Sequence, residues 1–202
     1  MDSFTTLKAI AVPIDQANVD TDQIIPARFL GRMRDRQVEG FFHDFRLDPN
    51  GRPREGVTLN NPAYKGAKIM VGNTNFACGS SRENAVTTMV DNGFRSFIAP
   101  SFGDIFFNNS FKNGFLPVIL TPAEVDRLFH ECAAFPGFRL VVDLEAQTVS
   151  TTDGSQSYRF DITGFRKYCL LNGLDEIGLT LRHSDKIAAF EARRKAQHPW
   201  YF

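Results

Sequence analysis

Residues 67–93 read AKIMVGNTNFACGSSRENAVTTMVDNG, which is the pattern of a buried strand, a turn rich in Gly and Ser, and a helix. The apolar run at 67–71 predicts the strand, because short apolar runs bounded by turn residues are typical of buried strands. We expect the helix over 81–90, since Asn92-Gly93 is a favourable helix end. Ligands of open α/β sheets bind beyond the carboxyl ends of strands, so the intervening turn is a candidate site.

The turn sequence CGSSRE at 78–83 has two interpretations. In a capping box, the Ser80 side chain would accept a backbone hydrogen bond three residues on, and Glu83 would reach back. In a ligand site, two hydroxyls and the Arg82 guanidinium would stand at a helix N-terminus, which favours a small carboxylate or phosphate. Capping does not explain Ser81, Arg82 or a glycine that permits close approach to the backbone. Spacing alone favours the two interpretations about equally.

The composition excludes several classes of protein. The chain has 202 residues and 43% hydrophobic content, enough for one sizeable core. Its 23 basic and 23 acidic residues balance, which argues against sequence-independent binding of nucleic acid. The sequence lacks an apolar run of about 18 residues, so we expect no membrane span. The start, MDSFTTLKAIAV, lacks a signal-peptide pattern, and we therefore expect a cytoplasmic protein.

The metal-ligating residue types are scattered along the chain. Cys78, Cys132 and Cys169 are far apart, odd in number and without CxxC spacing. This pattern indicates a reducing compartment and argues against a disulfide framework or a metal site held by this chain alone. Asp20 and Asp22 flank a Thr and could act as acid and base, but such residues more often form Asx-turns and helix caps. The high count of 20 Phe predicts a buried interface with a partner in addition to the core.

The remaining pattern predicts an α/β chain with parallel crossovers. Strands are expected at 6–12, where Pro13 would end the first one, and at 94–99 and 115–120. Helices are expected at 27–33, from Ser101, and from the capping box that Thr121 begins. The alternation of strands and helices favours parallel pairing. Next, 138–144 and 157–162 predict a hairpin around 152–155, and helices are expected at 165–171, 174–179 and 184–197.

Four stretches in chain order resemble one known family. They are NVDTDQIIP at 18–26, CGSSRE at 78–83, IAPSFGDIFFNN at 98–109 and FRKYCLLNGLDEIGLTL at 165–181. Here, and over essentially the whole chain, the sequence closely resembles the small subunits of 3-isopropylmalate dehydratase (isopropylmalate isomerase), in the aconitase superfamily. The resemblance implies one swivel-like domain of β/β/α layers over 1–202, with a helical extension at 163–202.

The resemblance also implies a partner and a reaction. The partner is a large subunit whose own cysteines hold a [4Fe–4S] cluster, so this chain would bind no metal itself. The reaction is the dehydration of 3-isopropylmalate to 2-isopropylmaleate and rehydration to 2-isopropylmalate, the second step of leucine biosynthesis. The small subunit would be inactive alone.

Residue roles follow from the resemblance one position at a time. Ser80 matches the serine that removes the proton α to a carboxylate, and Arg82 would stabilise its alkoxide and hold a substrate carboxylate. A serine hydroxyl is a very weak base, so it needs such a positive charge to ionise. Ser81 would add a hydrogen bond. Asp22 matches an active-site aspartate, and Thr21 accompanies it.

Three further residues complete the expected substrate site. Gly79 belongs to the matched turn, and Arg28 and Arg32 fall where the family has its substrate-selecting loop. An arginine suits that position because its guanidinium matches the geometry of a carboxylate. The resemblance leaves open the alkyl group that is accommodated, the stoichiometry of the complex and which arginine of residues 28–36 faces the ligand.

The chain departs from the family pattern near this site. Ala77 stands where the family usually has Gly, and Asn84 where it usually has His; Gly103 and Ser110 replace the commoner Ala and Cys. These changes allow two alternatives, a hydro-lyase acting on another alkyl-substituted malate and a swivel domain that binds anions without catalysis. A serine hydrolase is disfavoured, since the turn lacks the second glycine of G-x-S-x-G.

Overall fold

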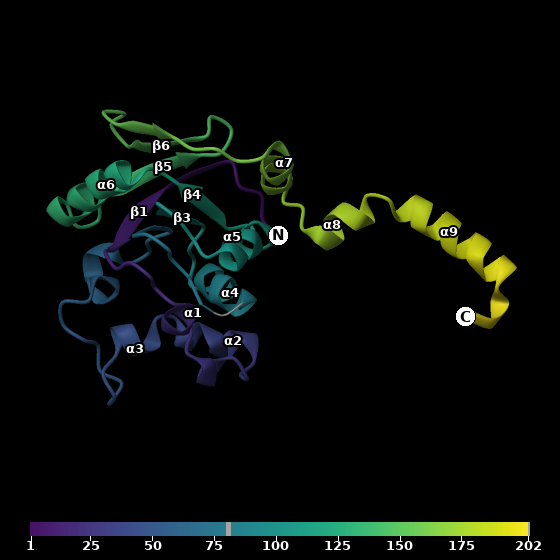
Figure 1. Ribbon diagram of the computed structural model, residues 1–202, viewed down its shortest axis with the longest axis horizontal. Helices are drawn as coiled ribbons and strands as arrows, with labels where there is room; N and C mark the ends of the chain where they lie inside the picture. Colours follow the sequence, from purple (N-terminus) through teal and green to yellow (C-terminus); the bar gives the residue numbers. More distant parts are fainter. Residues whose placement is uncertain (80–81, 202) are drawn as a thin grey trace.

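The computed structural model describes residues 1–79 and 82–201, and within them the strands form one seven-stranded sheet in the order β4-β3-β2-β1-β5-β6-β7 (Figure 1). The strands are β1 (Thr6–Ile14), β2 (Ile69–Gly72), β3 (Ser96–Ala99), β4 (Leu116–Ile119), β5 (Arg139–Asp143), β6 (Thr148–Thr151) and β7 (Ser157–Arg159). The sheet has a parallel half, β1 to β4, and an antiparallel half, β5 to β7. This mixed α/β architecture confirms the predicted fold class.

Strand β1 joins the two halves of the sheet. Its first part pairs antiparallel with β5, up to the pair Ile10 and Arg139, and its last part pairs parallel with β2. The expectation that Pro13 ends this strand is wrong, because Pro13 pairs in register with Val71. The Ala11 N–H donates to Phe138 O on the β5 side, and Pro13 faces the same way beyond the end of β5. A missing N–H is tolerated where no neighbouring strand requires it.

The helices that build the parallel half follow the predicted alternation. They are α4 (Glu83–Asp91), α5 (Asp104–Lys112) and α6 (Pro122–Ala134). The crossovers β2-α4-β3-α5-β4 are parallel, as the sequence predicts. Thr121 caps α6 with the predicted box, in which Glu124 bonds back to the Thr121 N–H at 2.8 Å. Ser101 does not cap α5, since its hydroxyl instead accepts the Asn75 N–H at 2.8 Å.

Short helices connect the elements that lie outside these crossovers. They are α1 (Thr21–Ile24), η1 (Ala27–Phe29), α2 (Arg34–Gln37), η2 (Val38–Gly40), α3 (His43–Arg46), η3 (Thr58–Asn60) and η4 (Pro62–Tyr64). The helix expected at 27–33 is therefore a single 3₁₀ turn, preceded by α1. The backbone N–H of Phe42 donates to Ile24 O and ties this region together.

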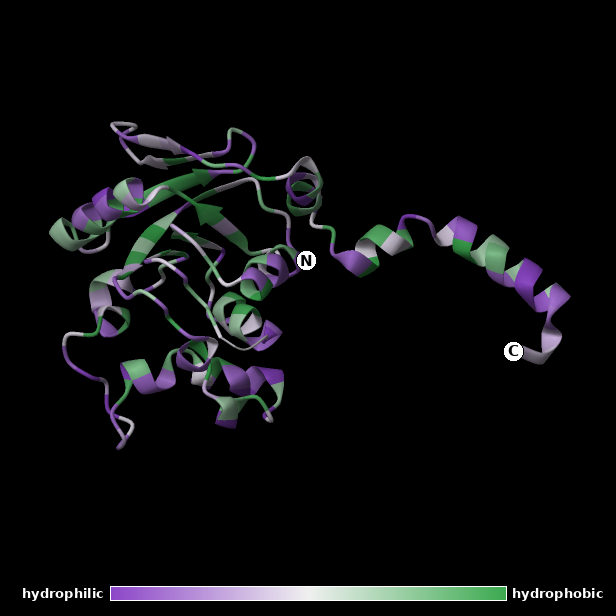
Figure 2. Ribbon diagram, viewed as in Figure 1, coloured by the Kyte–Doolittle hydropathy of each residue, from purple (hydrophilic) through white to green (hydrophobic). Residues whose placement is uncertain are grey.

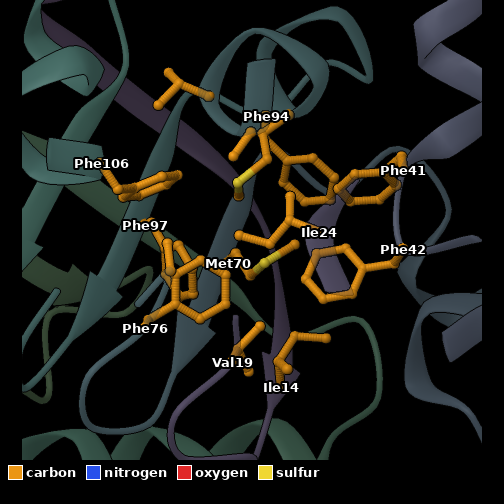
Figure 3. Close-up of a cluster of buried hydrophobic side chains, with 14 of the residues drawn as sticks. Ile14, Val19, Ile24, Phe41, Phe42, Met70, Phe76, Phe94, Phe97 and Phe106 are labelled. Carbon is orange, nitrogen blue, oxygen red and sulfur yellow. The ribbon is translucent and has the colours of Figure 1, made fainter. Parts of the chain in front are cut away.

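Two apolar cores lie on opposite faces of the parallel strands. Residues of β1 alternate between them, with Val12 and Ile14 in one and Ala9 and Ala11 in the other, as the period of two requires. Figure 3 shows the first core, in which Phe rings from 41–42, 76, 94, 97 and 106 surround Met70. Helix α6 and the antiparallel strands cover the second core. Most of the many Phe residues thus pack inside the chain.

The antiparallel half corrects the predicted hairpin. Strand β6 lies between β5 and β7, so the turn at 152–155 joins β6 to β7 and not 138–144 to 157–162. The missed turn, 144–147, is LEAQ and contains no Gly, Pro or Asn. It closes because Asp143 accepts the Ala146 N–H at 2.7 Å and Gln147 adopts a positive φ of 56°. A single Asp at the end of a strand is a weak local signal for a turn.

The C-terminal helices extend from one side of the sheet. Helix α7 (Gly164–Asn172) packs on the body through the buried Leu170, and Gly173 ends it at φ 64°. Helices α8 (Glu176–Leu181) and α9 (Ser184–Gln197) and the turn η5 (Pro199–Tyr201) then project away from the body (Figure 1). No helix in the described part of the chain has the length and apolar character that a membrane span requires.

Candidate active site

The loop after β2 lies between the loops that follow β1 and β3. Its backbone is hydrogen-bonded to both, since the Cys78 N–H donates to Val19 O at 3.1 Å and the Phe76 N–H donates to Ser101 O at 3.1 Å. These loops are at the carboxyl ends of parallel strands, where ligands of α/β sheets bind. The site is therefore at the edge of the sheet that the sequence predicts.

A cavity of about 230 Å³ opens at this edge. It is lined by Thr21, Ala77, Gly79, Arg82, Gly103, Asp104, Ile105 and Phe106. Arg82 is the N-cap of α4 and Gly103 is the N-cap of α5, so two helix N-termini meet at the cavity. Free N–H groups, positive dipole ends and a guanidinium together favour a small anion.

Arg82 and Asp22 form an ion pair at the cavity, through Nη1 of the guanidinium and Oδ1 of the carboxylate. The Arg82 side chain is only 18% exposed, whereas that of Asp22 is 52% exposed. The pair brings together two residues separated by 60 positions in sequence. A largely buried guanidinium with one exposed partner is well suited to exchange that partner for a ligand carboxylate.

Asp20 and Asp22 have different roles, although both flank Thr21. Asp20 is the N-cap of α1 and accepts the Asp22 N–H at 2.7 Å, while Gln23 bonds back to the Asp20 N–H at 2.9 Å. The prediction that these residues form caps is confirmed for Asp20. Asp22 instead stands in the first turn of α1 and faces Arg82.

Gly79 allows the loop to pass close to the α1 cap. Its φ is +91°, and a Cβ there would lie 2.1 Å from Oδ2 of Asp20. Residues with a side chain disfavour this φ, and the carboxylate occupies the space that a side chain would need. Glycine is therefore required at this position for two separate reasons.

The predicted serines Ser80 and Ser81 lie outside the described residues. Helix α4 begins at Glu83, which is its first residue and does not hold the third position that a capping box requires. The capping-box interpretation is therefore wrong for Glu83, and the part that concerns Ser80 lies outside the described residues. The Glu83 carboxylate instead accepts a hydrogen bond from Nδ2 of Asn113 at 3.0 Å, and so links α4 to the end of α5.

Arg28 and Arg32 do not line the cavity. Arg28 pairs with Asp44, and Arg32 Nη1 lies 3.1 Å from Glu39 Oε2. Both guanidinium groups lie over the Phe29 ring, at 5.0 and 4.4 Å from its centroid. The Arg28 hydrogen bond, with a further one from His43, holds the pKa of the Asp44 carboxyl well below its usual range. That Arg28 and Arg32 bind the substrate stays a prediction.

The cysteines of the chain do not fit a metal or iron–sulfur site. Cys132 is buried in the second core, and burial raises the pKa of its thiol to about 12. Burial also raises the pKa of Cys169, while Cys78 stands alone in the loop after β2. Among residues 1–79 and 82–201, no group of three or more His, Cys, Asp or Glu side chains could hold a metal ion.

Sequence reasoning missed Gly103 and Asp104 as cavity residues. Both follow β3 at the same sheet edge as the loop after β2. Their position directly after a predicted parallel strand could have identified them as cavity residues. Asn84 is also explained by the structure: Nδ2 of Asn84 donates to Oε1 of the buried Gln37 at 2.8 Å. Gln37 in turn donates to Arg32 O at 2.9 Å, so this network ties α4 to the segment that carries Arg32.

Two departures from the family pattern, Ala77 and Gly103, touch each other. Ala77 adopts φ +57°, which costs an L-residue free energy, and a Cβ on Gly103 would lie 2.4 Å from Ala77 O. We expect Ala77→Gly to stabilise the protein by about 1 kcal/mol and Gly103→Ala to destabilise it by about 1–3 kcal/mol. The double variant should be more stable than the sum of the two single effects predicts, because glycine at position 77 lets its carbonyl oxygen move away from the new Cβ at position 103. Chemical denaturation of all four proteins measures this coupling, and strict additivity would contradict it.

Comparisons with known proteins agree along the whole chain. Family matches cover residues 1–123 (Aconitase C-terminal domain), 126–164 (LeuD_N) and 176–202 (the C-terminal domain of the 3-isopropylmalate dehydratase small subunit). The 3-isopropylmalate dehydratase small subunit of Neisseria gonorrhoeae is 50% identical over 100% of this chain and 99% of its own. That of Bordetella avium is 51% identical over 99% of this chain and 97% of its own.

The fold is also found in a solved structure. The crystal structure of 3-isopropylmalate dehydratase (leuD) from Methanocaldococcus jannaschii has a TM-score of 0.66, covering 92% of this chain and 99% of that one, at 24% identity. This likeness concerns the fold, whereas the sequence matches concern the family. The sequence matches show that this chain belongs to the family of 3-isopropylmalate dehydratase small subunits.

Proposed function

We propose that this chain is the small subunit of a hydro-lyase that interconverts 2-isopropylmalate and 3-isopropylmalate through 2-isopropylmaleate, in leucine biosynthesis. The observation that carries the proposal is the cavity at the N-termini of α4 and α5, with the Arg82 guanidinium in its wall. An alkylmalate has two carboxylates, and this cavity offers the charge and N–H donors that such an anion needs. Relatives about 50% identical over the full length have the corresponding name.

The catalytic roles that we propose follow the chemistry of proton removal next to a carboxylate. Ser80 oxygen takes the proton from the carbon α to a substrate carboxylate, and it returns a proton when water adds in the reverse direction. Arg82 holds that carboxylate and stabilises the alkoxide, because a serine hydroxyl ionises only beside a fixed positive charge. Asp22 keeps the Arg82 guanidinium in place before substrate binds. Ser81, Thr21 and Gly79 bind the substrate.

The enzyme is completed by a large subunit, as the name of the relatives implies. Aconitase-family enzymes of this kind use an iron–sulfur cluster, whereas Cys132 and Cys169 of this chain are buried and the described residues contain no group of candidate metal ligands. The large subunit therefore holds the [4Fe–4S] cluster, which supplies a Lewis acid for the substrate hydroxyl. This chain contributes the base and the carboxylate site from its own residues.

The same proposal covers the remaining expectations. Arg28 and Arg32 meet the substrate when the loop that carries them is covered by the large subunit, and there they select the alkyl group. Residues 1–202 act as one swivel-like domain with a helical extension at 163–202. The enzyme works in the cytoplasm, without membrane or nucleic-acid partners.

Replacing Ser80 by alanine tests the catalytic role. We expect turnover of 2-isopropylmaleate by the complex to fall by about 10⁴-fold or more, since the base is removed. Affinity for the large subunit should stay unchanged, because the substitution removes only one hydroxyl group. Ser157→Ala, an exposed serine on β7, is the matched control. Full turnover by the Ser80→Ala complex would show that this residue is not the base, and a non-catalytic anion-binding domain would show no turnover in either form.

One observation favours a second candidate, a hydro-lyase for another alkyl-substituted malate. Ala77 lines the cavity and adds a methyl group where the family usually has glycine. A narrower cavity favours a smaller alkyl group, such as a methyl. A panel of 2-isopropylmaleate and its methylated analogues, assayed on the reconstituted complex, separates the two. A kcat/KM for the methylated analogue above that for 2-isopropylmaleate would establish the second candidate.

A further inference from the structure

The C-terminal arm, defined as residues 176–201, concentrates exposed apolar surface. Of the twelve large hydrophobic side chains that are exposed in the described chain, six belong to the arm. They are Ile177, Leu181, Ile187, Phe190, Trp200 and Tyr201. Figure 2 shows green, hydrophobic segments among purple, hydrophilic ones along α8 and α9, which project from the body. Aromatic residues such as Trp and Tyr are typical of the energetic centres of protein interfaces.

The arm does not stabilise itself. Its root is fixed to the body, since Lys112 Nζ lies 2.8 Å from Glu176 Oε1 and Arg182 contacts Tyr168. From Ser184 onward, the hydrogen bonds and ring contacts shown among the described residues stay within the arm. Helix α9 has 14 residues, and isolated helices of about 12–15 residues are marginal in water. A surface that covers its apolar side chains is therefore required for a stable arm.

The family matches indicate what covers it. Residues 1–123 match the general aconitase C-terminal domain, whereas 176–202 match a separate family described as the C-terminal domain of the small subunit. The arm is thus characteristic of chains that form a separate small subunit. The arm also leaves the body beside the C-terminal end of α5, the helix whose N-terminal end lines the cavity.

The charge of the arm defines the chemistry of that surface. Five basic residues stand in 176–202 against three acidic ones. On α9, Arg194 falls on the same side as Ile187 and Phe190 by helical spacing, while Ala192 falls on the opposite side. Such an arm fits an apolar groove with a rim of carboxylates.

We propose that the arm docks into an apolar, acid-rimmed groove on the large subunit and so acts as a non-covalent tether. This inference rests on the proposed function, because it takes the large subunit as the partner. A docked arm keeps the cavity at a high effective concentration beside the large subunit while the body remains able to move, as a short linker would.

The test uses the full chain with Ile187→Asp and Phe190→Asp combined, and Ala192→Asp as the matched control. Both variants place charge on exposed positions of α9, so circular dichroism and the melting temperature should match those of the unmodified chain. We expect the double variant to raise the Kd for the purified large subunit by about 100-fold or more, since two buried apolar side chains are lost. Ala192→Asp should change it by less than about threefold. At saturating small subunit, kcat should be equal in all three.

Three outcomes would overturn the docking proposal. The first is an equal Kd for the three proteins. The second is a self-associated form of the unmodified chain in analytical ultracentrifugation that the double variant abolishes while its Kd for the large subunit stays the same. The third is a lowered kcat at saturation, which would place the arm in the active site. A complex with the expected Kd pattern but no turnover of any alkylmaleate would support docking and contradict the proposed function, so the two are distinguishable.

Discussion

Replacing Arg82 by alanine is expected to lower kcat/KM for 2-isopropylmaleate by about 10³-fold. The Arg82 side chain is only 18% exposed, the residue stands at the N-cap position of α4 beside the cavity, and the side chain of its partner Asp22 is 52% exposed. In the proposed mechanism the same group binds a substrate carboxylate and stabilises the ionised serine, so its loss affects both kcat and KM. Arg82→Lys should recover a minor part of the loss, because an ammonium keeps the charge but not the two-pronged geometry.

The control lies at the other end of the same helix. Arg34 binds Asp91, the last residue of α4, through two hydrogen bonds of 2.8 and 2.9 Å. Arg34→Ala removes a comparable arginine–carboxylate pair without touching the cavity, so we expect a change in kcat/KM of less than about threefold and little loss of stability. Steady-state kinetics of the complexes that contain the unmodified chain, Arg82→Ala or Arg34→Ala measure the difference in kcat/KM. Equal losses for Arg82→Ala and Arg34→Ala would show that Arg82 has only a structural role.

Gly79→Ala is expected to destabilise the protein by about 2–3 kcal/mol and to lower kcat/KM by about 10²-fold. The first part of the cost is the φ of +91° at Gly79. The second part is the new Cβ, which would lie 2.1 Å from the Asp20 carboxylate that caps α1. If the carboxylate moves away, the cap is lost and Asp22 shifts with α1. Activity therefore falls together with stability.

Gly93→Ala separates the two parts of this cost. Gly93 has the same φ of +91°, but a Cβ there would meet nothing within 4 Å. We expect that variant to lose about 1–2 kcal/mol, from the backbone term alone, and to keep its kcat/KM. Chemical denaturation and kinetics of the two variants give the difference that belongs to the Asp20 contact. If Gly79→Ala cost no more than Gly93→Ala and retained full activity, the cap of α1 would not organise the site.

The sequence predicts the central part of this fold because its signals are local. The run 67–71, the pair Asn92-Gly93 and the box begun by Thr121 each contain turn, cap or strand chemistry within a few residues. The same local logic located the site, since the turn after β2 must lie at the carboxyl edge of the sheet. The resemblance then named the family, and the comparisons confirmed it.

Four features were not predictable, and three of them depend on contacts between distant residues. Pro13 continues β1 only because β5 ends before it, which no local pattern shows. The exception is the turn before β6, which is local but closes through Asp143 and a left-handed Gln147 without any Gly or Pro. The different roles of Asp20 and Asp22 arise from Arg82, which lies 60 positions beyond Asp22. At the cavity, glycine is required at position 103 because a Cβ there would clash with Ala77 O. This contact joins residues from two different loops.

The most direct test of the central claim is anaerobic reconstitution with the large subunit, followed by an assay for hydration of 2-isopropylmaleate. We predict that the pair consumes 2-isopropylmaleate and forms 2- and 3-isopropylmalate, while neither chain does so alone. A stable complex with an intact cluster that leaves 2-isopropylmaleate unchanged would contradict the proposed function.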